Sequence, residues 1–225
     1  MRGFGPMSLL ALLALLFLLP LLFGELMVAS LAKLNLSPST ALGLVVAMLV
    51  GGAINIPVKR LDTPGGKPAH PLAAYRLENL WPQLWQARRV SVVAVNVGGC
   101  LIPLLIVAYE VSVLAETNPG ALVIAAIASA LNTWVCYRVA RPVPRVGIMM
   151  PALVSPLVSA FLALILAPEV SAPVAFITGV LGPLIGADLL HLREFERSGA
   201  AIVSIGGAGT FDGIVLSGII AAYLA

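Results

Sequence analysis

The sequence predicts an all-α protein: a polytopic bundle of about seven transmembrane helices, forming a single integral membrane domain over residues 1–225. The chain is 60% hydrophobic and only 10% charged, and its mean hydropathy is +1.05. An average soluble domain is about 25% charged. Several apolar stretches approach or exceed the roughly 20 residues that a helix needs to cross a bilayer. No soluble domain of useful size fits beside these stretches, so the lipid bilayer is the expected surrounding.

The apolar stretches are separated by short turns that contain Pro, Gly and Arg. We expect spans over about residues 7–34, 41–56, 90–114, 121–137, 146–166, 171–192 and 200–224. Ser37 is placed to cap the helix of the second span. A cleaved signal peptide is the alternative for the first span. Because its apolar run is longer than the roughly 7–15 residues of a signal sequence, we favour a retained helix.

Residues 58–89 form the only long polar segment, which we expect on the cytoplasmic face. Its second half has apolar residues at helical spacing with arginines nearby, which favours a short helix lying in the membrane interface. A lid over a site is the alternative. The apolar residues are Leu77, Leu80, Trp81, Leu84 and Trp85.

The basic residues predict the orientation. Of the 13 Lys and Arg residues, only Lys33 falls in a turn on the opposite side of the seven-span arrangement. Since cytoplasmic loops are enriched in Lys and Arg, we expect the N-terminus inside and the C-terminus outside. The expected location is the inner or plasma membrane of the cell, as a multi-pass protein.

The sequence has no motif for a metal or another cofactor. Cys100 and Cys136 lie in apolar segments, without C-x-x-C or zinc-finger spacing, so we expect buried free thiols. The segment Asp62–Lys67 lacks the spacing of a phosphate-binding loop. We therefore expect no cofactor, no metal and no nucleic-acid partner, while the oligomeric state is not predicted.

Two aspartates in consecutive apolar segments are the strongest candidates for a functional site. Asp188 lies in the sixth expected span and Asp212 in the seventh. An ionisable side chain within a span costs about 2.5–3.5 kcal/mol on insertion scales, which makes it a functional candidate by default. In a regular helix from residue 200, Asp212 would lie about 18 Å deep, too deep to meet Asp188. The glycines at 206–209 weaken the helix, and an unwound segment there would bring the carboxyl groups to one depth.

Two carboxylates in one cavity titrate as a coupled pair, so that one keeps a proton while the other ionises. Such a pair is the catalytic centre of an aspartic protease, in which one carboxylate activates water and the other donates a proton. We expect Asp188 and Asp212 as the catalytic residues. The residues expected to line the substrate site or cavity are Gly207, Gly209, Asn55, Asn96 and His191.

The two aspartate motifs, GADLLHL at 186–192 and GAGTFDG at 207–213, resemble those of intramembrane aspartyl proteases of the presenilin and signal peptide peptidase type. That family places one aspartate in its sixth span and a second after a glycine-rich motif in its seventh, and has a Pro-Ala-Leu motif, which is found here at residues 151–153. The resemblance implies a transmembrane peptide as substrate. GGAINIP, GADLLHL and GGAGTFDG also resemble an uncharacterised family of small prokaryotic polytopic membrane proteins.

Three other interpretations use the same residues. In an ion- or proton-coupled transporter or channel, the aspartates would bind a small ion or relay protons, with Asn55, Asn96 and Asn132 supplying oxygens. In a metal enzyme, Asp188, His191 and Glu194 would share a site with Asp212. In a structural interpretation, polar side chains join helices by hydrogen bonds, which we favour for Asn96 and Asn132.

Overall fold

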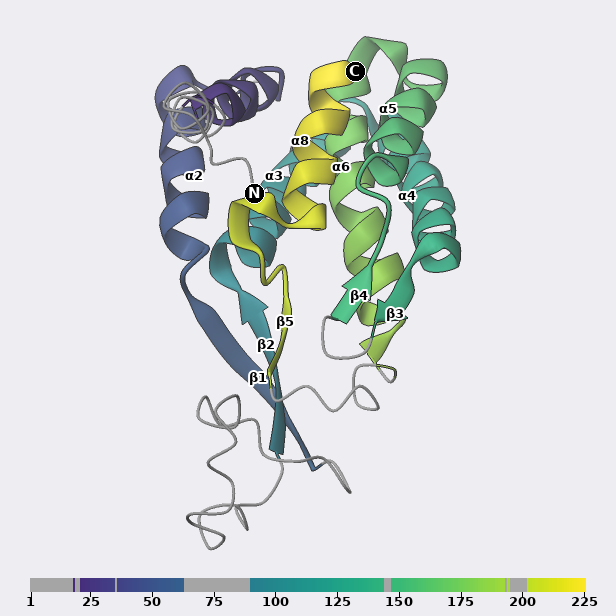
Figure 1. Ribbon diagram of the computed structural model, residues 1–225. Helices are drawn as coiled ribbons and strands as arrows, with labels where there is room; N and C mark the ends of the chain where they lie inside the picture. Colours follow the sequence, from purple (N-terminus) through teal and green to yellow (C-terminus); the bar gives the residue numbers. More distant parts are fainter. Residues whose placement is uncertain are drawn as a thin grey trace, which may run out of the picture.

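The computed structural model describes residues 18, 21–34, 36–62, 90–143, 147–192, 194 and 202–225. Within these residues the chain is mostly helical, as predicted (Figure 1). The interfacial helix predicted in the second half of residues 58–89, and the first half of the expected span 7–34, lie outside the described residues.

Three described helices are long and apolar enough to cross a membrane, and four are shorter. The long ones are Val97–Thr117, Pro119–Val139 and Pro168–Leu189, where the first and third include irregular helical turns. The short ones are Leu21–Ala32, Pro38–Gly51, Val154–Leu166 and Gly213–Leu224. The regular helices are α2 (Pro38–Gly51), α3 (Ile102–Thr117), α4 (Pro119–Val139), α5 (Val154–Leu166), α6 (Ser171–Pro183) and α8 (Gly213–Leu224). The irregular turns are the π-helices η4 (Val97–Leu101) and η6 (Leu184–Leu189) and the 3-10 helices η5 (Pro168–Val170) and η7 (Gly209–Phe211). As predicted, Ser37 caps α2 by accepting a hydrogen bond from the Thr40 N–H.

The expectation that the protein is all-α is wrong, because the structure contains β-sheet. Strands β1 (Asn55–Asp62), β2 (Val90–Asn96) and β5 (Ile202–Ile205) form a sheet in the order β1-β2-β5. β1 pairs antiparallel with β2, and β5 pairs parallel with β2. Strands β3 (Arg141–Val143) and β4 (Gly147–Met149) form a separate hairpin. Short apolar segments cannot be assigned to helix or strand by periodicity alone, and the Val- and Ile-rich composition of β2 and β5 favours strand.

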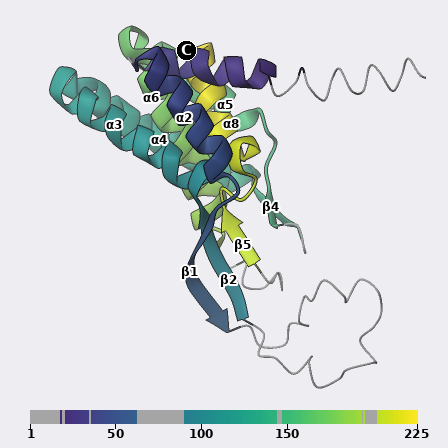
Figure 2. The same cartoon turned by 90° about the vertical axis from the view of Figure 1, so that its left-hand side faces the viewer.

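The three-stranded sheet extends from one end of the helical bundle (Figures 1 and 2). Each strand is continuous with a helix: β1 follows α2, β2 leads through η4 into α3, and β5 leads through η7 into α8. Pairing the strands therefore brings one end of these three helices together. Helices α4 and α5 form the other side of the bundle, and α6 lies between the two sides (Figure 1).

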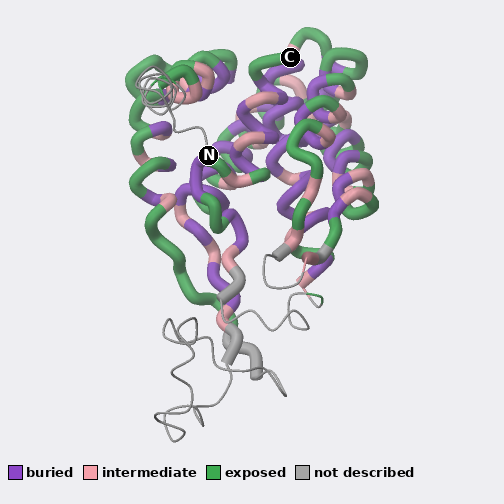
Figure 3. The backbone as a smooth tube through the Cα atoms, in the orientation of Figure 1, coloured by how far each residue is buried: buried purple, intermediate pink, exposed green. Residues whose placement is uncertain are grey.

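Helix α6 is the core of the bundle, and the tube in Figure 3 is buried along most of it. Every residue from Ser171 to Val180 is buried. α6 packs against α4, α5 and α8. Its small residues allow this close approach. At Gly179, for example, an added Cβ would lie under 3.0 Å from the backbone of Ser217 in α8.

A polar cluster joins these helices inside the core. The Asn132 side-chain amide of α4 lies 2.9 Å from the hydroxyls of Ser155 and Ser159 and 3.0 Å from the Thr178 carbonyl oxygen. The Ser155 hydroxyl in turn lies 2.6 Å from that of Ser217. Hydrogen bonds of this kind join spans where apolar side chains gain nothing over lipid. The structural interpretation of Asn132 agrees with these contacts.

At six glycines, the connections between helices and strands pack with their backbones in direct contact. An added Cβ at Gly98 would lie under 3.0 Å from backbone atoms of Met48 and Gly52, and one at Gly99 would clash with the Gly206 backbone in the same way. Gly206 and Gly209 also have φ angles of +70° and +62°, which glycine adopts without strain. We call Gly51, Gly52, Gly98, Gly99, Gly206 and Gly209 the glycine junction.

The outer faces of the helices are apolar. Large hydrophobic side chains are exposed along α2, α3, α4 and α5, on the side of each helix that faces away from the core. Such extensive exposed apolar surface is rare in soluble monomers and is typical of a protein surrounded by lipid. The residues include Leu42, Leu49, Leu105, Val123, Ile127, Trp134, Leu157, Phe161 and Ile165.

We expect Gly99→Ala to destabilise the protein, whereas Gly43→Ala should not. The new methyl group at position 99 would clash with the backbone of Gly206, in the turn that follows β5. Overpacking of this kind costs about 1–3 kcal/mol. At Gly43, within α2, an added Cβ meets nothing within 4 Å. Alanine there should stabilise the helix by about 0.5–1 kcal/mol. Thermal unfolding of both variants in the same detergent measures the difference. Equal melting temperatures would contradict the role of the glycine junction.

Candidate functional site

Asp188 lies in the π-helical turn η6, where α6 ends on the sheet side of the bundle. Gly186 allows this turn to pack closely on α4, since an added Cβ would lie under 3.0 Å from the Thr133 carbonyl oxygen. The Asp188 carboxyl group is half-buried and accepts a hydrogen bond from the backbone N–H of Gly206. π-helical turns within α-helices are rare and occur frequently at functional sites.

Asp212 is the N-cap of α8. Its Oδ1 accepts a hydrogen bond from the Ile214 N–H at 3.0 Å, and its Oδ2 accepts one from the Ala208 N–H at 3.3 Å. The chain before it is not α-helical, as the glycines at 206–209 predicted: β5 ends at Ile205, and α8 begins only at Gly213. Asp212 therefore lies at the start of the last helix and not deep within it.

The two carboxyl groups are near neighbours. Both accept hydrogen bonds from the same turn, Asp188 from the Gly206 N–H and Asp212 from the Ala208 N–H. Both aspartates are half-buried, whereas Cys100 is buried. The unwound segment and the parallel pairing of β5 with β2 thus bring η4, η6 and η7 to one place. As expected, Cys100 and Cys136 are buried free thiols.

Two asparagines expected to line the site are joined next to the glycine junction. Asn96 is fully buried, and its Nδ2 donates to the Gly52 carbonyl at 2.8 Å and to Asn55 Oδ1 at 3.1 Å. Its Oδ1 accepts from the Gly99 N–H at 2.7 Å. Asn55 is exposed at the start of β1 and also accepts a hydrogen bond from the Ser204 hydroxyl of β5. This chain of hydrogen bonds connects all three strand ends, a role for Ser204 that no sequence motif indicated.

The other expected lining residues are divided between two places. Gly207 is exposed in the turn before Asp212, and Gly209 is buried against Gly52. His191 is directed elsewhere, because its Nδ1 lies 3.0 Å from the carbonyls of Gly186 and Ala187 and its ring lies against that of Tyr137, 4.8 Å between centroids. Among the described residues, no three His, Cys, Asp or Glu side chains are grouped so that they could hold a metal ion.

Glu110 is a candidate that the sequence analysis missed. It is 1% exposed at the centre of the buried face of α3, and neither carboxyl oxygen has a hydrogen-bond partner. It was overlooked because it lies close to the end of the expected span 90–114, where acidic residues are ordinary. The available signal was its position in the apolar stretch from Ile102 to Leu114.

Comparison with known proteins finds one family. The family model described as "Protein of unknown function (DUF1614)" matches residues 49–224, which include both aspartates, Glu110 and all six glycines of the junction. No curated protein and no solved structure matches the chain.

We expect Asp212→Ala to destabilise the protein by about 0.5–2 kcal/mol, the usual effect of removing an N-cap side chain. Asp212→Asn should cost less, because the amide oxygen can still accept the hydrogen bond from the Ile214 N–H and only the longer bond from the Ala208 N–H is lost. Chemical or thermal unfolding of the two variants in detergent tests this. If the Asn variant were as unstable as the Ala variant, the negative charge and not the cap would hold this turn together.

Proposed function

We propose that this chain, which belongs to the DUF1614 family, is an intramembrane aspartyl protease with Asp188 and Asp212 as its catalytic pair. One observation carries the proposal: two half-buried carboxyl groups from separate segments accept hydrogen bonds from one turn, residues 206–208, at the sheet-side end of the helical bundle. Buried acids in a membrane protein are expensive and usually functional. Two acidic side chains in one site are better explained by acid–base chemistry than by a role in helix packing.

The proposed reaction is hydrolysis of a peptide bond in a membrane-embedded segment. The ionised member of the pair removes a proton from water, whose oxygen adds to the carbonyl carbon while the protonated member donates to the carbonyl oxygen. Proton transfer to the amide nitrogen then releases the amine and leaves a carboxylic acid. Each aspartate oxygen keeps a free lone pair beside its backbone hydrogen bond, so the backbone can orient the carboxyl groups without occupying them. In this scheme the exposed Gly207 and the buried Gly209 border the substrate site.

We further propose that all seven apolar helices cross the cell membrane, with the sheet end inside. The distribution of basic residues supports this orientation. Lys59 in β1, Arg138 at the end of α4 and Arg141 in β3 belong to the sheet end. Lys33 belongs to the opposite end, where its Nζ donates to the carbonyl of Tyr223 near the end of α8. An excess of positive charge on one side is the usual sign of the cytoplasmic face.

A second candidate function, ion- or proton-coupled transport, is favoured by the way the helices end. α2, α3 and α8 all give way to irregular backbone at the glycine junction, beside the two aspartates. Transporters place ion sites where helices are interrupted in this way. In that case, activity would require a proton or sodium gradient, which a protease does not need.

The test of the proposal is peptide cleavage by the reconstituted chain. A tagged single-span peptide with a Gly-Pro interruption is incorporated with the protein into lipid vesicles, and products are identified by mass spectrometry. We expect cleavage by the unaltered chain and a loss of about 100-fold or more for Asp188→Asn and for Asp212→Asn, since general acid–base groups contribute about 10²–10⁴-fold.

The matched control is Glu169→Gln, which removes an exposed carboxylate from the turn between α5 and α6. This variant should cleave normally. The Asn substitution at 212 keeps the α8 cap, so a loss of activity there cannot be attributed to unfolding. Cleavage at an unchanged rate by both Asn variants would rule out the catalytic pair.

The proposed orientation predicts opposite labelling of two introduced cysteines. Val58→Cys lies in β1 and Thr117→Cys at the end of α3, and both positions are exposed. A membrane-impermeant maleimide added to intact cells should label only position 117, and position 58 should react only after the membrane is opened. The buried Cys100 and Cys136 serve as the internal background. Labelling of position 58 from outside would reverse the orientation.

A further inference from the structure

Glu110 lies in the most enclosed part of α3. Ile106, Glu110 and Leu114 are spaced by four residues, so they form one stripe along the helix, and all three are buried. Glu110 is seven residues from the end of α3 at Thr117, which corresponds to about 10 Å along the axis. Its carboxyl group is thus well inside the bundle and far along α3 from the glycine junction.

No charged group compensates Glu110 within the described residues. Helices α2, α6 and α8, which pack against α3, contain no Lys, Arg, Asp or Glu within their bounds, and the only titratable side chain among them is the exposed Tyr223 of α8. α4 has only Cys136, Tyr137 and Arg138, near its sheet-side end, and η4 has only Cys100. On α3 itself, Tyr109 and Glu116 are exposed.

A carboxyl group in this position is far more stable with a proton than without one. An ionised carboxylate that has neither a counter-ion nor a hydrogen-bond donor loses most of its hydration energy on burial, so such groups take up a proton instead. Both Glu110 oxygens lack a partner. The Ser129 hydroxyl of α4 and the Thr178 hydroxyl of α6 are also buried without a partner, on two helices that pack against α3.

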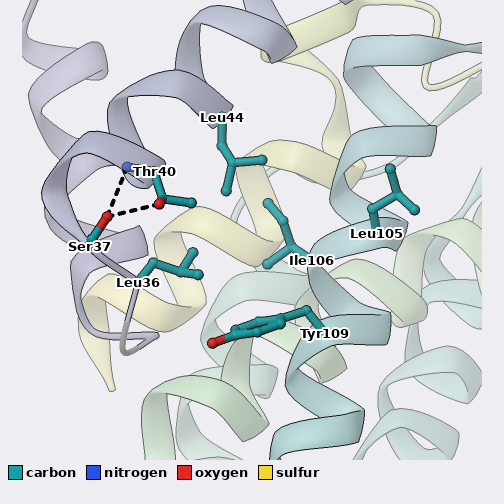
Figure 4. Close-up of a pocket in the computed structure, with 7 residues that line it drawn as sticks. All are labelled: Leu36, Ser37, Thr40, Leu44, Leu105, Ile106 and Tyr109. Atoms are coloured by element: carbon teal, nitrogen blue, oxygen red, sulfur yellow. Dashed lines mark hydrogen bonds between the residues drawn. The ribbon is translucent and has the colours of Figure 1, made fainter.

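A groove at the surface lies within one turn of Glu110 along α3. It has a volume of about 390 Å³ and lies between α2 and α3, with Leu44 on one side and Leu105 and Ile106 on the other (Figure 4). Its residues also include Tyr109, the immediate neighbour of Glu110, and the hydroxyls of Ser37 and Thr40. Ile106 is both part of the groove and one turn from Glu110, so the groove comes within one turn of the residue that carries the carboxyl group.

We propose that Glu110 is a proton-binding site inside the bundle, which is loaded in this conformation and exchanges its proton through the groove between α2 and α3. The site is distinct from the aspartate pair and does not depend on the proposed protease function. Its ligand is a proton. A small cation would need several oxygen ligands around the carboxylate, and among the described residues neither Glu110 oxygen has a polar atom within hydrogen-bond distance.

The test is modification by dicyclohexylcarbodiimide, an apolar reagent that reacts with protonated carboxyl groups. The full-length chain in lipid nanodiscs is treated at several pH values, and adducts are mapped by mass spectrometry. We expect an adduct on Glu110 whose yield falls as the pH rises. The adduct should be lost in Glu110→Gln, and retained in Glu116→Gln and in Asp188→Asn. Protection of Glu110 by sodium ions would overturn the assignment in favour of a cation site.

Infrared spectroscopy provides a measurement that does not require reagent access. The carbonyl stretch of protonated carboxyl groups should be weaker in Glu110→Gln than in the unaltered chain, and the difference spectrum should show the lost band, which Asp188→Asn should still contain. If no such band is lost and no adduct forms, Glu110 binds no proton and the proposal is wrong.

Two tryptophan variants test the route. Leu44→Trp fills the groove between α2 and α3 and should slow modification of Glu110. Ile124→Trp fills a groove of similar size, about 370 Å³, between α4 and the α5–α6 turn, and should leave the rate unchanged. Equal rates in both variants would show that the proton does not pass between α2 and α3.

Discussion

Close backbone contact at the glycine junction is the constraint on which the rest of the structure depends. Three helices end or begin there, and each continues as a strand of the same sheet. The strands can pair only if the chain segments approach more closely than any side chain permits, as at Gly98 and Gly99. Because two of the glycines also adopt positive φ angles, the chain can turn between β5 and α8 without strain.

The aspartate pair is a consequence of this packing. The turn before α8 delays the helix until Gly213, so Asp212 caps it instead of lying within it. The Gly206 N–H, part of the same turn, donates to Asp188 at the end of α6. Backbone hydrogen bonds therefore orient both carboxyl groups, while their half-buried positions leave them accessible to water.

Glu110 differs from this pair in every physical respect. The aspartates are half-buried, close to each other and hydrogen-bonded to the backbone, whereas Glu110 is fully buried and has no partner. Elsewhere in the bundle, polar side chains are paired across helices, as Asn132 is with Ser155 and Ser159. An acidic group left alone in such a core is expensive to keep, which is the reason to assign it a ligand.

The sequence by itself determined that the protein is predominantly helical, that its helices are apolar enough for a membrane, and that the last helix is interrupted before Asp212. These properties follow from local composition, since hydrophobic length and glycine content act on the segment that contains them. Only the tertiary structure decided that 55–62, 90–96 and 202–205 form a sheet, that Asn96 joins their ends, that His191 turns toward Tyr137, and that Glu110 has no partner. Strand pairing and burial depend on segments far apart in the chain, and a single sequence does not state which of them meet.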